Sequence, residues 1–150
     1  MTCASVMTPD PEVAAPDWTV ERTVELLLER RYRSIPVADS DRRLIGVFSI
    51  HRLLALSLPM LASEDPESVD RLRWLSDDLE DLRAKLHRHW NRPVSEVMET
   101  DVVTVEPDTP LVRAVIALYH THYNLPVVQA DGGRIVGIIS YWDVVPRILR

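Results

Sequence analysis

The hydrophobic positions of this chain fall into short strand-like runs and helical stripes. Residues 134–140 form a continuous apolar run around Gly137, which predicts a short buried strand. The chain then turns at Ser140, and residues 142–149 have the apolar spacing of a helix. The pattern therefore predicts a strand that leads directly into a closing helix.

The same arrangement occurs earlier in the chain. In the run 43–49, Gly46 and Ser49 stand as Gly137 and Ser140 stand in the later run, at a nearly constant offset of about ninety residues. Further matching pairs are Pro36 and Pro126, Met7 and Met98, and Pro16 and Pro107. The sequence therefore contains an internal duplication.

Each copy predicts the order strand, helix, strand, strand, helix, which is an α+β fold. The first helix is expected over about 19–31, and its counterpart is expected to begin with Thr109 as N-cap and Pro110 in the first turn. Residues 101–105 are the clearer of the two opening strands, because the matching residues 12–15 are too short to assign from their own pattern. The remaining predictions are strands at 35–38, 44–49, 125–129 and 134–140, and helices at 50–57 and 142–149.

A long insertion, residues 58–93, separates the copies. Residues 65–67 (Asp-Pro-Glu) are typical of a helix start, and Pro93 ends the predicted helix. Its leucines are spaced three and four residues apart, as in a coiled coil: Leu72, Leu75, Leu79, Leu82 and Leu86. This stripe packs either on the repeats or a dimer mate, or it docks a separate effector.

Composition narrows the class of protein. The 150 residues, 46% hydrophobic and 27% charged, are typical of one soluble globular unit. A formal charge of −6 argues against nucleic acid or an anionic membrane as the main partner, and no apolar run is long enough to span a bilayer. The single cysteine, Cys3, excludes an internal disulfide. Because residues 1–5 lack a basic start and an apolar signal core, we expect a cytoplasmic protein.

Ser140 and Asp143 are the candidate ligand-binding pair. They lie three residues apart at the predicted strand-to-helix turn, where both side chains can reach one small polar ligand. The carboxylate of Asp143 only accepts hydrogen bonds, whereas the hydroxyl of Ser140 donates or accepts, so the pair suits a ribose diol better than a phosphate. The alternative is that the pair only caps the helix.

The duplicated segments Met-Thr, Val-Thr-Val-x-Pro, Leu-Pro-Val-Val and Gly-Ile-Ile-Ser-x-x-Asp resemble a pair of CBS (cystathionine-β-synthase) domains, often called a Bateman module. The resemblance places one repeat at 3–57 and the other at 94–149. It implies that the copies pack through their sheets around a pseudo-two-fold axis and bind adenosine-containing ligands in the clefts between them. The expected ligand is AMP, ADP or ATP, with S-adenosylmethionine and NAD as further candidates, and no cofactor is required.

The resemblance also implies the residues of one nucleotide site. The Ser/Thr-x-x-Asp pair of this family binds the ribose, so Ser140 and Asp143 are expected there, with Ile138 against the base. The first copy is expected to contribute Met7 and Val13 to the adenine pocket, and Tyr32, Arg33 and Ser34 near the phosphates. The guanidinium of Arg33 matches phosphate oxygens, although a solvated surface arginine is the alternative.

The mirror-related cleft departs from this pattern. Ser49 is present, but Arg52 stands where the aspartate is expected and has no acceptor for a ribose hydroxyl. The facing loop around Asn124 lacks an arginine. We therefore expect one working site and one degenerate site.

Two histidine pairs, His87 with His89 and His120 with His122, invite a metal interpretation. Residues i and i+2 of a helix point in opposed directions, so neither pair faces a single ion, and we expect no metal site. No Gly-rich phosphate loop, paired-carboxylate motif or Ser-His-Asp order is present, so we expect no catalytic residues and no enzyme.

The sequence thus predicts a regulatory protein that senses an adenine nucleotide and signals by a change of conformation or assembly. We expect a homodimer, because the closing helix 142–149 carries more apolar surface than one copy needs, and a protein target remains to be identified. The alternative is a dimerisation or scaffold protein that binds no ligand and uses the insertion helix for partners.

Overall fold

The structure, a computed structural model, describes residues 1–58 and 79–150. The predicted helix start at 65–67 and the leucines Leu72 and Leu75 lie outside the described residues. None of the described helices is long and apolar enough to cross a membrane.

The first half of the chain forms an antiparallel hairpin flanked by helices. Its elements are α1 (Val20–Arg30), β2 (Ser34–Ala38), β3 (Leu44–Ser49) and α2 (Ile50–Ser57). The side chain of Thr19 caps α1 by accepting a hydrogen bond from the backbone N–H of Arg22 at 3.1 Å. Ser49 caps α2 in the same way, so polar residues fix both helix starts.

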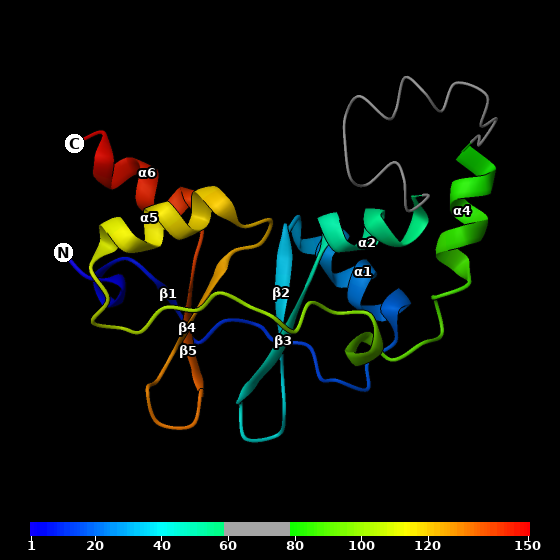
Figure 1. Ribbon diagram of the computed structural model, residues 1–150, viewed down its shortest axis with the longest axis horizontal. Helices are drawn as coiled ribbons and strands as arrows, with labels where there is room; N and C mark the ends of the chain where they lie inside the picture. Colours follow the sequence, from blue (N-terminus) through cyan, green and yellow to red (C-terminus); the bar gives the residue numbers. More distant parts are fainter. Residues whose placement is uncertain (59–78) are drawn as a thin grey trace.

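The second half repeats this order with α5 (Leu111–His120), β4 (Leu125–Val128), β5 (Ile135–Ile139) and α6 (Tyr141–Ile148). The β4–β5 hairpin turns at Gly132 and Gly133, whose φ angles of 76° and 69° suit glycine. In Figure 1, the two hairpins lie side by side, and α1 with α2 and α5 with α6 cover the same side of them.

The short segment that precedes each half in the sequence packs on the other half, so the two halves exchange these leading segments. β1 (Thr8–Pro9), preceded by a short 3₁₀ turn η1 (Cys3–Ser5), pairs with β5 of the second half. In return, η2 (Val94–Glu96) packs on the first half, and Glu99 pairs with Val47 of β3. Figure 1 shows the N-terminus beside α5 rather than beside α1. Each half is therefore completed by the other.

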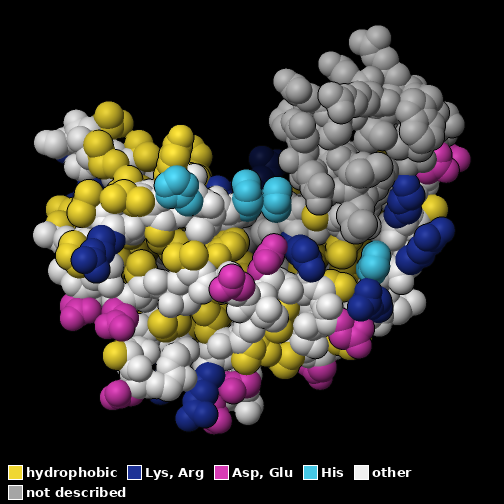
Figure 2. Space-filling view, viewed as in Figure 1, with side chains coloured by type: hydrophobic (Ala, Val, Ile, Leu, Met, Phe, Trp, Pro, Cys, Tyr) yellow, Lys and Arg dark blue, Asp and Glu magenta, His cyan; other side chains and the backbone are white. Residues whose placement is uncertain are grey.

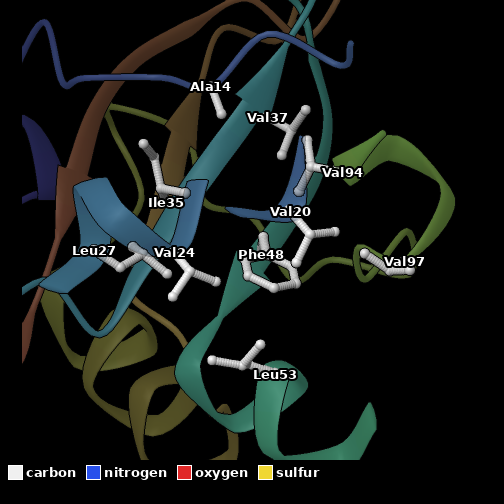
Figure 3. Packing of buried hydrophobic residues seen from close by; sticks show 10 residues of the cluster. All are labelled: Ala14, Val20, Val24, Leu27, Ile35, Val37, Phe48, Leu53, Val94 and Val97. Atoms are coloured by element: carbon white, nitrogen blue, oxygen red, sulfur yellow. The ribbon is translucent and has the colours of Figure 1, made fainter. Parts of the chain in front are cut away.

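Each half has its own hydrophobic core, and the exchanged segments belong to them. In Figure 3, Val94 and Val97 lie with Val20, Val37 and Phe48 in the first core. The second core contains Cys3 from the N-terminal segment, together with Leu118, Leu125, Val127, Ile139 and others. Burial raises the pKa of the Cys3 thiol. Exchange of these segments joins the halves through buried apolar surface.

The hairpins also contact each other directly. The backbone N–H of Leu44 donates to the carbonyl of Gly133 at 3.0 Å, and that of Ile135 donates to the carbonyl of Arg42 at 2.9 Å. At the start of β2 and β4, the backbone N–H of Asn124 donates to the hydroxyl of Ser34 at 2.9 Å. The predicted sheet-to-sheet packing of the two copies is thus observed.

Two predictions about the second copy were wrong. Residues 101–105 do not form a strand; only Val105 makes a bridge, to Val127, as Ala14 does to Val37 in the first half. The chain then enters a turn in which the Thr109 hydroxyl accepts from the backbone N–H of Glu106. Thr109 is therefore engaged before the helix, and Pro110 occupies the N-cap position of α5.

The insertion helix ends earlier in the sequence than predicted. α4 (Leu79–His87) gives way to turns before Pro93 is reached. Leu86 and Trp90 pack against the first core, whereas Leu79 is 72% exposed. Of the described leucines, Leu86 in the last turn of α4 therefore packs back on the first repeat, and Leu79 at its start is exposed.

Candidate functional site

A cavity of about 530 Å³ lies between the two halves. The second half contributes the end of β5 and the start of α6, and the first half contributes the segment after β1 and the loop from α1 into β2. Its walls are Thr8 and residues 10–12, residues 31–36, Asn124, Ile138 and residues 140–143. A drug-sized ligand fits a cavity of this volume.

Ser140 and Asp143 form a capping box at the start of α6. One carboxylate oxygen of Asp143, Oδ2, accepts from both the backbone N–H and the hydroxyl of Ser140, at 2.7 and 2.9 Å. The other oxygen, Oδ1, accepts no hydrogen bond from the described residues. The helix cap weighed as the alternative is thus present, and it fixes the carboxylate while leaving Oδ1 for a ligand.

Arg33 reaches the same cavity from the first half. Its Nη2 donates to the carbonyl of Thr121 at 3.5 Å, and its guanidinium carbon lies 5.1 Å from the centre of the Tyr141 ring. Its Nε is buried and has no hydrogen-bond partner among the described residues. An unpaired buried donor is costly, and the guanidinium that carries it belongs to a residue of the cavity wall, where it is suited to an anion.

The other implied residues divide between the cavity wall and its surroundings. Tyr32, Ser34 and Ile138 line the cavity. Met7 and Val13 do not: Met7 packs on Gly137 of β5, and Val13 lies between the lining residue Glu12 and the bridging residue Ala14. In both cases a neighbour in sequence lines the cavity instead.

Asn124 lines the 530 Å³ cavity and not the second cleft. Sequence equivalence assigned it to the degenerate site, but its backbone N–H donates to the hydroxyl of Ser34, which draws it into this wall. Its position follows from contact between the halves, which an internal alignment does not contain.

Several lining residues were not identified from the sequence. Acidic Asp10 and Glu12 each meet an arginine outside the lining, Arg42 at 3.2 Å and Arg30 at 3.4 Å. Arg31 lines the cavity from the end of α1 with a left-handed backbone, φ 56°. Further lining comes from Pro11, Tyr141 and Trp142, the last 87% exposed. Their closeness in sequence to the predicted residues was the available signal.

The second cleft has a different construction. The Ser49 hydroxyl accepts from the backbone N–H of Arg52 at 3.0 Å, and Ser49 is only 1% exposed. The side chain of Arg52 is turned onto the carbonyl of Val97, which accepts from Nε at 2.7 Å. A separate cavity of about 230 Å³ is lined by Gly46, Thr100, Thr104 and others but by neither Ser49 nor Arg52.

The histidines of the two candidate metal pairs have separate partners. His87 stacks on Trp90. His89 lies 2.9 Å from Nη1 of Arg92, and burial, followed by the charge of Arg92, lowers the pKa of His89. His120 packs edge-on against Tyr119, whereas His122 stacks on His51. Within residues 1–58 and 79–150, no group of three or more His, Cys, Asp or Glu side chains is arranged to hold a metal ion.

The duplication, the interlocked α+β halves and the cavity between them are features of CBS-domain pairs. The family model "CBS domain" matches residues 3–58 and 94–150, so the chain belongs to the CBS domain family and holds two such domains.

Known relatives agree with this assignment. The chain is 34% identical over 94% of its length to the CBS domain-containing protein CBSX1, chloroplastic, of Arabidopsis thaliana, and 29% identical over 99% of its length to CBSX2, chloroplastic, of the same plant. It spans 60% and 64% of the length of these relatives.

Solved structures show the same fold. The crystal structure of CBSX2 from Arabidopsis thaliana matches with a TM-score of 0.76 and 29% identity, covering 99% of this chain and 94% of that one. A structure of CBSX2 in complex with AMP matches with a TM-score of 0.72 and 28% identity, covering 99% of this chain and 96% of that one.

Proposed function

We propose that this protein is a regulatory, non-catalytic sensor of an adenine nucleotide (AMP, ADP or ATP), which binds in the 530 Å³ cavity between the two repeats. The observation that carries this proposal is the pair of unused polar atoms at one cavity. Oδ1 of Asp143 is an acceptor without a partner among the described residues, and Nε of Arg33 is a donor without one.

These two atoms match the two polar ends of a nucleotide. A carboxylate oxygen accepts from ribose hydroxyls, and an arginine donates to phosphate oxygens. Ile138 offers an apolar contact for the base. The relative CBSX2, 28% identical to this chain, has been solved with AMP, which supports this class of ligand.

The position of the ligand suggests how binding produces a signal. Asp143 stands on the second half and Arg33 on the first, so a nucleotide held by both joins the two halves. It favours the arrangement that it binds better, by no more than its differential affinity for the two arrangements. The response is therefore a shift in how the two halves pack on each other, or in how a partner protein packs on them.

A second copy of the chain is the partner proposed for the helical side of the second half. α5 and α6 leave large apolar side chains exposed, namely Val112, Ile116, Tyr119, Trp142, Val145, Ile148 and Leu149. Figure 2 shows hydrophobic side chains gathered over these two helices. Contiguous apolar surface on this scale is typical of an interface. Because Asp143 lies in the first turn of α6 and this helix continues into the apolar surface, binding and assembly share one helix.

Calorimetric titration of the purified protein with AMP, ADP, ATP, S-adenosylmethionine and NAD tests the proposal. We expect saturable binding of at least one adenine nucleotide and a rise in the midpoint of thermal unfolding with its concentration. Absence of binding by all five ligands contradicts the sensor function.

The second candidate function is a scaffold that binds no nucleotide. The exposed apolar face of α5 and α6, and the exposed Leu79 of α4, favour it. Under this function the protein self-associates or binds partners with the cavity empty. The same titrations distinguish the two, because only a sensor is stabilised by ligand.

A further inference from the structure

The cleft related to the nucleotide cavity by the internal duplication is crossed by a pair of stacked histidines. His51 stands in the first turn of α2, and His122 stands between α5 and β4. Their ring centres are 3.8 Å apart and their planes differ by 9°. Both residues reach the surface, although their rings cover each other, and Figure 2 shows histidine side chains gathered between the two groups of helices. The stack joins one repeat to the other.

The neighbouring Arg52 does not occupy this gap as a ligand-binding residue. Its Nε is held on the carbonyl of Val97 at 2.7 Å. Ser49, the remaining part of the ligand-binding pattern, is buried and caps α2. The second cleft therefore keeps a direct contact between repeats where the first cleft has a cavity.

We propose that the His51–His122 stack is a proton-sensitive latch: it holds the second cleft closed while the His51 ring is neutral and loosens this contact between the repeats when acidification charges that ring. While the rings are uncharged, their atoms are in van der Waals contact across the cleft and attract each other by dispersion. Two imidazolium rings at this separation carry like charges and repel each other.

The surroundings of the pair determine the direction of the effect. Burial is the main cause that lowers the pKa of His51, followed by the charge of His122, and Arg52 lowers this pKa further, while Glu99 raises it. The folded protein thus accepts a proton on His51 less readily than the unfolded chain does. The stability contributed by neutral His51 is complete above the ordinary range of imidazole and is lost as the pH falls through its lowered pKa.

The latch is connected to the nucleotide cavity through residues 121–124. The Thr121 carbonyl at one end of this segment accepts from Arg33, and the Asn124 N–H at the other end donates to Ser34. His122 lies between these two contacts. Release of the stack therefore loosens two residues of the cavity wall, Arg33 and Ser34. This extension to ligand affinity rests on the proposed nucleotide function, whereas the latch itself does not.

The first experiment needs no nucleotide. Paramagnetic labels on Leu54→Cys of α2 and Arg113→Cys of α5, both exposed, report the distance between the repeats while the native Cys3 is buried. We expect this distance to lengthen or broaden between about pH 7.5 and about pH 5.5. In a His122→Phe background, which keeps an aromatic stack without a titrating ring, we expect the distance to change less over the same range. An unchanged distance in the protein with both histidines overturns the proposal.

Thermal unfolding gives an independent test of the same latch. We expect the midpoint to fall on acidification in the native sequence and to fall less in His51→Gln and in His122→Phe. His120→Gln is the matched control, because His120 lies two residues away and contacts Tyr119 rather than His51. An equal acid-induced fall in all four proteins contradicts the latch, whatever the nucleotide titrations show.

Discussion

The carboxylate of Asp143 holds the hydroxyl and the backbone N–H of Ser140 on a single oxygen, Oδ2, at 2.9 and 2.7 Å. One residue therefore caps α6 and presents its second oxygen at the cavity. The two interpretations of the Ser-x-x-Asp pattern, helix cap and ribose ligand, are compatible in this geometry, and substitutions can separate them.

Replacing Asp143 with Ala should weaken an adenine nucleotide by about ten- to a hundred-fold or more, because charge-assisted hydrogen bonds contribute roughly 1.5–3 kcal/mol each. Loss of the cap should also lower the free energy of unfolding by about 1 kcal/mol. Calorimetric titration measures the first effect and chemical denaturation the second.

Ser49→Ala is the matched control for the cap, since Ser49 caps α2 without lining the larger cavity. It should lower stability by a similar amount, about 1 kcal/mol, and leave nucleotide affinity nearly unchanged. Equal nucleotide affinities for the native protein and Asp143→Ala are the result that removes the ribose assignment.

Arg33 should determine how strongly the phosphate contributes to binding. Arg33→Met keeps much of the apolar stem but removes the donors, so affinity for AMP should fall about ten-fold or more while affinity for adenosine changes little. Titrating both ligands into both proteins provides the comparison. If adenosine and AMP lose affinity equally, Arg33 supports the cavity wall and does not bind phosphate.

Much of this fold was predictable because its signals are local. Ser49 and Ser140 mark helix starts in the sequence, and Gly132 and Gly133 mark a hairpin turn, so α2, β3 and the β4–β5 hairpin appear close to where they were expected. The prediction of Thr109 as the N-cap of α5 was wrong because its hydroxyl accepts from the Glu106 N–H in the preceding turn.

The composition of the site was less predictable, since it depends on contacts between the halves. Asn124 lines the larger cavity because it bonds to Ser34 of the other repeat. Met7 stands beside the cavity, not in it, because the exchanged N-terminal segment places it on Gly137. Periodicity and internal alignment describe each copy alone, so neither contains this information.

The apolar face of α5 and α6 should control assembly. Ile148→Glu places a charge on an exposed apolar position of α6, which is nearly neutral for a monomer but costs several kcal/mol if a second copy covers it. We expect light scattering to report a dimer for the native protein and a monomer for the variant. Leu28→Glu, on the exposed side of α1, is the control and should leave the mass unchanged. A native protein that is monomeric at tens of micromolar contradicts the dimer.

Two leucines of the insertion should differ in their effects. Leu86 packs against the first core, so Leu86→Ala should destabilise the protein by roughly 1–3 kcal/mol, whereas Leu79→Ala, at a position 72% exposed, should change stability by less than about 0.5 kcal/mol. Denaturant titration of both variants measures the difference. Similar losses would mean that α4 does not pack on the repeat as described.

The exchange of leading segments brings Met7 against Gly137, and this contact can be tested by substitution. A β-carbon on Gly137 would meet the sulfur and side-chain carbons of Met7, which packs directly on β5. Gly137→Ala should therefore cost roughly 1–3 kcal/mol of stability, because the strand is held on both edges and the methionine must move. Met7→Ala alone should also destabilise, since it removes apolar contacts from the second core.

The double variant Met7→Ala/Gly137→Ala tests whether the two residues are in contact in solution. Removing the methionine side chain creates room for the new β-carbon, so the double variant should be more stable than the sum of the two single effects predicts, by about 0.5–3 kcal/mol. Gly46→Ala paired with Met7→Ala is the control cycle: Gly46 meets Met98 instead, so these two effects should add. Additive effects in the first cycle would contradict the packing of the N-terminal segment on the second repeat, and with it the exchange that forms one wall of the cavity.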